Sequence, residues 1–356
     1  MTRIQKTTLR SIAFVNATML AFAIQIASAK PATGAQGLWV ASGNQISEFQ
    51  GSALTSSGTP KAHTTFDIKH CIVAYSMALD GDKNLWITAL NNSQTGDVSI
   101  IEVRRAEILS VQAGDVAKTR LVAPGGPGIK NTGWTGIGFD AAEDLLVTNG
   151  GQQLLEVTPE ELKSKIPSPA IVISSMVWFP WSLRFDSSDN LWVNVGNSQL
   201  WRFAPADRAT SGTANPSLIV NLPADFGVQD LAFDGSGNLW IAGADFAMGN
   251  TDEIKEISAG DLGGTGEITP TIAATITSSA FGTEAGLGGF CLGGIDFDQS
   301  GNLWASARCQ FPALIEFTPS QLNIGGNLTP SITISPNRKK TNLSFPGPIR
   351  FGPTVH

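Results

Sequence analysis

One eleven-residue phrase recurs along this chain and constrains its fold more than any other feature. It pairs apolar residues with a central turn and ends in Leu-Trp before another apolar residue. The copies are LRFDSSDNLWV from Leu183, LAFDGSGNLWI from Leu231, IDFDQSGNLWA from Ile295, MALDGDKNLWI from Met77 and the weaker IGFDAAEDLLV from Ile137. Repetition at intervals of this kind predicts a supersecondary unit that buries its apolar faces against neighbouring copies of itself.

The chemistry of one copy predicts a β-hairpin. Apolar residues alternate at Leu231 and Phe233, as in a strand, and the turn beginning at Asp234 carries Gly and Asn, which tolerate positive φ. The repeated turn aspartates could also suggest calcium, but their regular use favours side chains that bond their own turn. Further β-rich phrases follow each copy, so we expect four antiparallel strands per unit. They start with LLEVTPEEL at Leu154, LWRFAPADR at Leu200, IKEISAGDL at Ile254 and LIEFTPSQL at Leu314.

Six copies can be counted at the Trp position of the phrase. They stand at Trp39, Trp86, Leu146, Trp192, Trp240 and Trp304. The first copy lacks a first strand, and the C-terminal GPIRFGPT from Gly347 resembles a first strand without its blade. We therefore predict an all-β fold, a six-bladed β-propeller of four-stranded antiparallel blades. Pairing of the N- and C-terminal segments would close the ring and remove its open edges.

The first 29 residues have the pattern of a secretory signal peptide. Arg3, Lys6 and Arg10 precede an apolar run that ends in Ala27-Ser28-Ala29, a small-residue cleavage pattern. The alternative is a membrane anchor, since the run is close to the shortest that spans a bilayer. Cleavage would leave a single domain over 30–356, without a further membrane span, and we expect a monomer that is secreted or periplasmic.

The charge of the chain argues against nucleic acid as a partner. The formal net charge is −7, and the predicted signal peptide contains three of the 23 Lys and Arg residues but no acid. The mature domain is therefore more acidic than the whole chain. Such a protein repels polyanions.

The phrases F-D-x-x-G-N-L-W-V and F-T-P-x-x-L resemble the bacterial NHL-type propellers. More broadly, they resemble the superfamily of streptogramin lyase-like and gluconolactonase-like propellers, over essentially the whole predicted domain. The resemblance implies the fold, whereas function varies on this scaffold. The resemblance implies, for the gluconolactonase-like enzymes, a divalent ion held by side chains from different blades, and no segment here matches those ligands residue by residue. For the streptogramin lyase-like enzymes it implies a His base, and only His70 of the three histidines can be placed. We therefore predict no metal and no cofactor.

Loops before first strands and after second strands should form one face around the channel mouth, where a site is expected. Aromatic residues outside the repeat could stack on a ligand there or plug the channel, and charged residues on inner strands could contact a ligand or form structural ion pairs. The candidate ligand-binding residues are Trp134, Trp178, Trp181, Arg184, Asp230, Glu284, Asp296 and Arg350.

The three cysteines allow one disulfide. Cys291 precedes a first strand and Cys309 follows the second strand of the same unit, so we expect these two to pair on that face. Cys71 beside His70 could be read as a nucleophile and its base, but adjacent strand residues point to opposite faces.

The sequence favours a non-catalytic binding module for a small molecule, glycan or protein at the loop-rich face. The alternative is a metal-dependent hydrolase or lyase of the gluconolactonase or streptogramin-lyase type, which rests on the resemblance alone. A third possibility is a structural scaffold at the cell surface.

Overall fold

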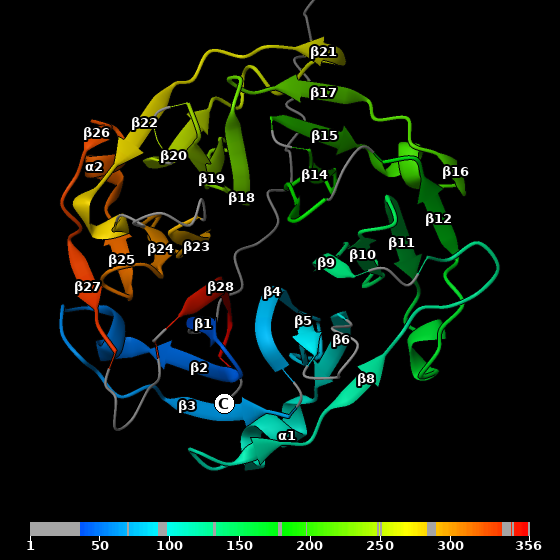
Figure 1. Ribbon diagram of the computed structural model, residues 1–356, viewed down its shortest axis with the longest axis horizontal. Helices are drawn as coiled ribbons and strands as arrows, with labels where there is room; N and C mark the ends of the chain where they lie inside the picture. Colours follow the sequence, from blue (N-terminus) through cyan, green and yellow to red (C-terminus); the bar gives the residue numbers. More distant parts are fainter. Residues whose placement is uncertain are drawn as a thin grey trace, which may run out of the picture. The chain divides into compact units, whose positions relative to one another are not determined.

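The protein is described by a computed structural model. The structure describes residues 36–69, 71–91, 98–130, 133–176, 180–196, 198–247, 249, 251–282, 290–336, 343 and 345–354. These residues form six β-sheets of four or five strands, arranged as the blades of a propeller (Figure 1). The predicted all-β, six-bladed fold is confirmed.

We number the blades in the order in which their second strands occur along the chain. The innermost strands of blades 1 to 6 are β28 (Pro346–Pro353), β4 (Cys71–Leu79), β9 (Trp134–Phe139), β13 (Leu183–Phe185), β18 (Phe226–Phe233) and β23 (Leu292–Phe297). The second strands are β1 (Gln36–Ser42), β5 (Leu85–Asn91), β10 (Leu145–Asn149), β14 (Leu191–Val195), β19 (Leu239–Asp245) and β24 (Leu303–Ala307). The third strands are β2 (Gln45–Gln50), β6 (Val98–Val103), β11 (Gln153–Val157), β15 (Gln199–Phe203), β20 (Thr251–Ile257) and β25 (Ala313–Phe317).

The outer part of each blade is bonded to its neighbour. The fourth strands are β3 (Thr64–Ile68), β8 (Arg120–Val122), β12 (Ile171–Ser174), β17 (Leu218–Asn221), β22 (Ala274–Thr277) and β27 (Ile332–Ile334). Short segments of the following blade pair in parallel with the outer strands of blades 1, 3, 4 and 5, namely β7 (Val116–Ala117), β16 (Gly212–Thr213), β21 (Gly266–Ile268) and β26 (Gly326–Asn327). These additions cover sheet edges that would otherwise expose unpaired backbone groups.

The helices are short and lie in the connections. The α-helices of the described residues are α1 (Arg105–Ser110) and α2 (Pro319–Leu322), and the 3-10 helices are η1 (Gly51–Leu54), η2 (Glu161–Lys163), η3 (Pro205–Arg208) and η4 (Ser279–Phe281). Among the described residues, no helix has the length and apolar character needed to cross a membrane.

The two ends of the chain complete blade 1, as predicted. Strand β28 lies beside β1 (Figure 1). The two strands pair antiparallel, in a register that places Arg350 opposite Trp39. The closure has one consequence for the repeat. In the other blades the inner strand is followed by the turn aspartate, but blade 1 has Gly352 at that position. Nε1 of the buried Trp39 has no hydrogen-bond partner among the described residues.

The repeated phrase builds both the turn and the contact between blades. In blade 5, Asp234 accepts hydrogen bonds from the backbone amides of Ser236 and Asn238 and, at 3.0 Å, from Nε1 of Trp240. The Trp240 ring packs against Phe297 of blade 6 with the centroids 5.9 Å apart. The same arrangement recurs at Trp192 and Trp304, so the turn aspartates act as Asx turns and the repeat Trp residues form the core between blades.

Blade 3, which has Leu146 at the Trp position, uses an arginine from blade 4 instead. Arg208 in η3 donates to Asp140 at 2.9 Å and to Glu156 at 3.1 Å, and its guanidinium lies 5.4 Å from the Phe185 ring centroid. It thus takes over both the hydrogen bond and the ring contact of the missing Trp. Burial raises the pKa of Glu156, and the neighbouring Arg208 opposes that rise.

Candidate functional site

The centre of the ring contains a buried cluster of charged residues from four inner strands. Asp230 on β18 accepts hydrogen bonds at Oδ2 from Arg184 of β13 (2.9 Å), from Arg350 of β28 (3.2 Å) and from the Ile295 amide (3.1 Å). Its other oxygen accepts from the Ser182 hydroxyl at 2.7 Å. Asp230 is therefore fully engaged by groups of the protein, and the arrangement is that of a structural ion-pair cluster.

The pKa values in this cluster follow from burial and the two guanidiniums. Burial raises the pKa of Asp230, but Arg184 and Arg350 outweigh it, so the net pKa is below the ordinary value. Burial raises the pKa of Asp296, and the same guanidiniums only partly oppose this. Burial, together with Arg350, lowers the pKa of Arg184 to about 10. The Asp296 carboxylate accepts from the amides of Phe297 and Phe351, at 3.0 and 2.6 Å.

A cavity of about 300 Å³ opens at the channel mouth directly above this cluster. Gln229 lines it and precedes Asp230, Trp181 lines it and precedes Ser182, and Pro348 lines it two residues before Arg350. The cavity thus lies where the inner strands begin. It is at the lower end of the range of small-molecule pockets, which is about 300 to 1,000 Å³.

Four aromatic side chains from four different blades line this cavity, which we call the mouth pocket. They are Tyr75 of blade 2, Trp181 of blade 4, Phe246 of blade 5 and Phe290 of blade 6. The rings of Tyr75 and Trp181 have centroids 5.8 Å apart, and those of Phe246 and Phe290 are 5.7 Å apart. The walls are therefore two aromatic pairs, suited to contact with a flat ligand.

Buried polar groups and a glycine position these rings. The Asn194 side chain accepts from the backbone amides of Trp181 and Ser182, at 2.9 and 2.7 Å, which fixes the segment before β13. Gly227 lies under the second aromatic pair. A Cβ there would be 2.6 Å from the Phe246 ring and 2.9 Å from the Phe290 ring, so only glycine allows both rings to pack at this point.

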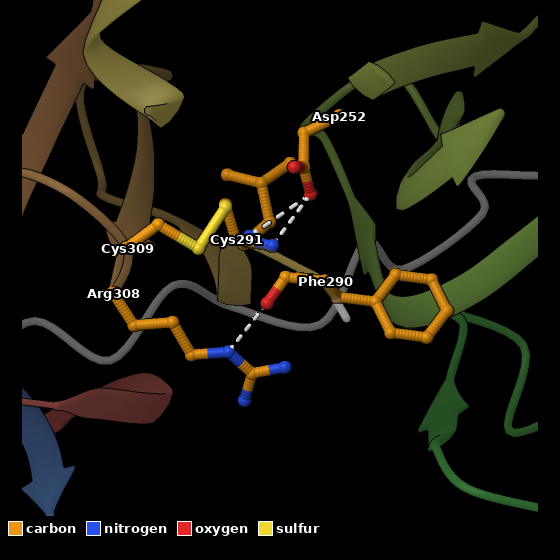
Figure 2. The surroundings of a disulfide bond; sticks show 6 residues. Asp252, Phe290, Cys291, Arg308 and Cys309 are labelled. Atoms are coloured by element: carbon orange, nitrogen blue, oxygen red, sulfur yellow. Dashed lines mark hydrogen bonds between the residues drawn. A yellow bond between two sulfur atoms is a disulfide. The ribbon is translucent and has the colours of Figure 1, made fainter. Parts of the chain in front are cut away.

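A disulfide between Cys291 and Cys309 lies beside the mouth pocket, with the Cα atoms 5.0 Å apart. The residue before each cysteine lines the pocket, and Nε of Arg308 donates to the Phe290 carbonyl at 2.7 Å (Figure 2). Asp252 accepts from the Cys291 amide at 2.9 Å on the other side of the disulfide. In Figure 2 the Phe290 ring points away from the sulfur atoms.

The structure separates the candidate residues into three groups. Trp181 lines the mouth pocket, whereas Arg184, Asp230, Asp296 and Arg350 form the cluster below it and do not line it. Trp134 does not lie at the mouth. It is 3% exposed and packs in the core shared by blades 2 and 3, because the first side chain of β9 points between the blades. Trp178 and Glu284 lie outside the described residues.

Sequence reasoning missed Tyr75, Phe246 and Arg308 as pocket residues. The sequence marks these positions only weakly as pocket residues. Tyr75 is the only tyrosine of the chain, and Arg308 precedes a cysteine of the disulfide. The buried thiol of Cys71 lies elsewhere. Burial raises its pKa to about 12, which keeps it protonated and removes the reading as a nucleophile. His70 and His356 lie outside the described residues.

One alternative location is less suited to a ligand. A cleft of about 330 Å³ lies between blades 2 and 3, on the side of the Asp80 turn, but its Glu102 already pairs with Arg104 and Arg120, and its Asp80 bonds Trp86. Within the described parts of the chain, no group of three or more His, Cys, Asp or Glu residues is placed to hold a metal ion.

Comparisons with known proteins bear on the fold alone. No protein-family model matches the chain, and a search of the curated proteins gives no match. Among solved structures, the chain is similar to a protein of unknown function from Bacteroides caccae, with a TM-score of 0.56 and 11% identity over 88% of this chain and 98% of that chain.

Two further structures are similar at lower scores. Apo AztD from Citrobacter koseri gives a TM-score of 0.49 and 10% identity, over 90% of this chain and 98% of that one. A catalytically inactive virginiamycin B lyase from Staphylococcus aureus, solved with quinupristin, gives 0.47 and 10%, over 82% and 84%. At 11% identity the likeness to the Bacteroides caccae protein concerns the fold alone, and the two likenesses with lower scores carry no argument.

Proposed function

We propose that this protein is an exported recognition module that binds a small ring-containing molecule in the mouth pocket and does not transform it. The observation that carries the proposal is the convergence of four aromatic side chains from four blades on one small cavity. Folding does not require these four rings to meet at one cavity, because the repeat Trp residues already supply the aromatic contacts between blades.

The exposure of Trp181 supports this reading. Its exposed fraction is 42%, whereas the repeat Trp residues are exposed by at most 2%. A large apolar ring left in water at the rim of a cavity is a feature of binding surfaces. The polar groups of the lining, such as the Gln229 amide and the Tyr75 hydroxyl, can bond a ligand, and burial raises the pKa of Tyr75 and so keeps that hydroxyl protonated.

Export is supported by two features of the chain. The pattern of residues 1–29 is that of a secretory signal, and a structural disulfide is typical of proteins in an oxidising compartment. The mass of protein recovered from the periplasm or the medium should correspond to a chain that begins at Lys30. Recovery of the uncleaved chain in the membrane fraction would contradict export as a free protein.

A fragment screen tests the binding function. One-ring and two-ring fragments are screened by ligand-observed NMR against the wild type, Trp181→Ala and Phe311→Ala. Phe311 is the matched control, because it is 66% exposed and lines a separate groove of about 260 Å³. We expect fragments whose signal is lost in Trp181→Ala and kept in Phe311→Ala.

Two results would contradict the proposal. One is the absence of any fragment that depends on Trp181, which would favour a structural scaffold. The other is chemical turnover of a bound fragment, which would place the protein among the enzymes.

A further inference from the structure

Three inner strands share an irregularity at the channel mouth. In blades 2, 5 and 6 the inner strand has a residue there that pairs with no residue of the second strand, because the register shifts at that point. These residues are Tyr75 of β4, Gln229 of β18 and Gly293 of β23, and all three line the mouth pocket. A bulge of this kind re-aims a side chain at the end of a strand. The bulges therefore help to decide which residues face the pocket.

Two of the three bulged residues carry a neutral polar side chain. Neither the Gln229 carboxamide nor the Tyr75 hydroxyl has a hydrogen-bond partner among the described residues, and neither residue is fully buried. The lining also includes the basic Arg308, but its guanidinium already bonds the Phe290 carbonyl at 2.7 Å and lies over the Phe345 ring. We therefore expect the polar side-chain contacts of a ligand to come from Gln229 and Tyr75, which carry no charge.

The chemistry of the Gln229 carboxamide narrows the ligand further. A carboxamide presents an N–H donor and a carbonyl acceptor side by side. It forms two parallel hydrogen bonds with a ring edge that offers an acceptor beside a donor, as glutamine does with the edge of a nucleobase. A planar ring with a carbonyl next to an N–H is a cyclic amide. Such a ring is uncharged and flat, so it also suits contact with aromatic walls.

We propose that the mouth pocket selects a planar cyclic amide, with the ring against the aromatic walls and its N–H and C=O edge on the Gln229 carboxamide. This inference rests on the proposed binding function and adds the chemical class of the ligand. The backbone under Gln229 is well anchored, because the next residue, Asp230, is bonded by Arg184 and Arg350. The pocket volume of about 300 Å³ limits the ligand to one or two rings.

The test compares two uncharged probes of nearly the same shape, 2-quinolinone and coumarin, by ligand-observed NMR titration at pH 7. Both are flat molecules of two fused rings with a ring carbonyl, but coumarin has an oxygen where 2-quinolinone has the N–H. That oxygen would face the Gln229 carbonyl and leave this acceptor without a donor. We expect the wild type to bind 2-quinolinone about tenfold more tightly than coumarin, the size of one hydrogen bond left unmade.

Three variants locate the preference. Gln229→Met keeps the length of the side chain and removes the carboxamide, so it should bring the affinities for the two probes within about twofold of each other. Gln112→Met makes the same change at an exposed glutamine that does not line the pocket, and this control should keep the preference. Tyr75→Phe should keep it as well, because both probes carry the carbonyl that the Tyr75 hydroxyl can bond.

The outcomes separate the two proposals. Equal binding of both probes that is lost in Trp181→Ala would overturn the cyclic amide inference and leave the binding function standing. A preference for 2-quinolinone that persists in Gln229→Met would overturn the role of Gln229. Failure of both probes to bind would overturn the inference as well, and the fragment screen would then decide the binding function. The comparison within the wild type needs no variant, so it stands if Gln229→Met does not fold.

Discussion

Replacing Asp230 by asparagine changes one charge at the centre of the ring and very little of its shape. The wild-type carboxylate is 4% exposed and is bonded by two guanidiniums, a hydroxyl and a backbone amide. The asparagine oxygen can still accept from Arg184 and Arg350, and the Ser182 hydroxyl can turn to accept from the new amide. The substitution therefore isolates the loss of the negative charge.

The magnitude follows from the burial of the cations left behind. Removing one partner of a buried ion pair costs about 3 to 5 kcal/mol, because the other charge remains in a medium that solvates it poorly. The side chains of Arg184 and Arg350 keep 12% and 11% of their exposure, so the lower end applies. We expect Asp230→Asn to lower the free energy of unfolding by about 3 kcal/mol at pH 7.

The assay is urea denaturation at fixed ionic strength, followed by Trp fluorescence and circular dichroism. The pKa of Asp230 in the folded state lies below the ordinary value for an aspartate. Its ionisation therefore stabilises the fold at a pH above that ordinary value, and this stabilisation is lost as the pH falls through the pKa of the folded state. The deficit of Asp230→Asn should therefore shrink below about pH 4. The exposed Asp82→Asn serves as a control with an effect within about 0.5 kcal/mol. A deficit under about 1 kcal/mol at pH 7, or one that grows on acidification, would show that the charge of Asp230 does not stabilise the cluster.

Three further changes probe other parts of the structure. The double variant Cys291→Ser, Cys309→Ser should lose about 3 kcal/mol of unfolding free energy, the amount expected for the loop that this disulfide closes. It should also weaken fragment binding, because the adjacent pocket residues lose their restraint, and unchanged melting and binding of the wild type under reducing conditions would contradict this. Arg208→Met should lose about 3 to 5 kcal/mol of unfolding free energy at pH 7, because it leaves the carboxylates of Asp140 and Glu156 unpaired. Unpaired buried carboxylates have raised pKa values and destabilise the fold as the pH rises through them, so the deficit measured by urea denaturation should be smaller at pH 5. Asp234→Ala should cost about 2 to 3 kcal/mol in thermal or urea unfolding, because it leaves the Trp240 indole N–H and two turn amides without their acceptor, and a loss below about 1 kcal/mol would count against the proposed role of the turn.

The fold could be predicted because its information is local and repeated. Four copies of the phrase contain a turn aspartate, the Trp that this aspartate binds and the strand residues on either side, as at Asp234 and Trp240. Closure of the ring was also predictable, since the incomplete copies at the two ends complement each other in the pairing of β1 with β28.

The site was less predictable because it depends on the directions in which side chains at the strand starts point, and the repeat does not encode these. Trp134 and Trp181 both precede or begin a first strand, yet one side chain points between blades and the other into the mouth pocket. The register shift between β9 and β10 lies at this strand start, where a single residue decides the direction. Arg208 replaces the missing Trp of blade 3 from a connection of blade 4, which no pattern within either copy indicates.

The most direct test of the binding site is a crystal structure of the protein with the best-binding fragment of the screen. We expect the ring of the fragment to lie in the mouth pocket, in contact with Trp181 and Phe290. A fragment found only in the groove beside Phe311, or only in the cleft between blades 2 and 3, with the mouth pocket empty, would contradict it.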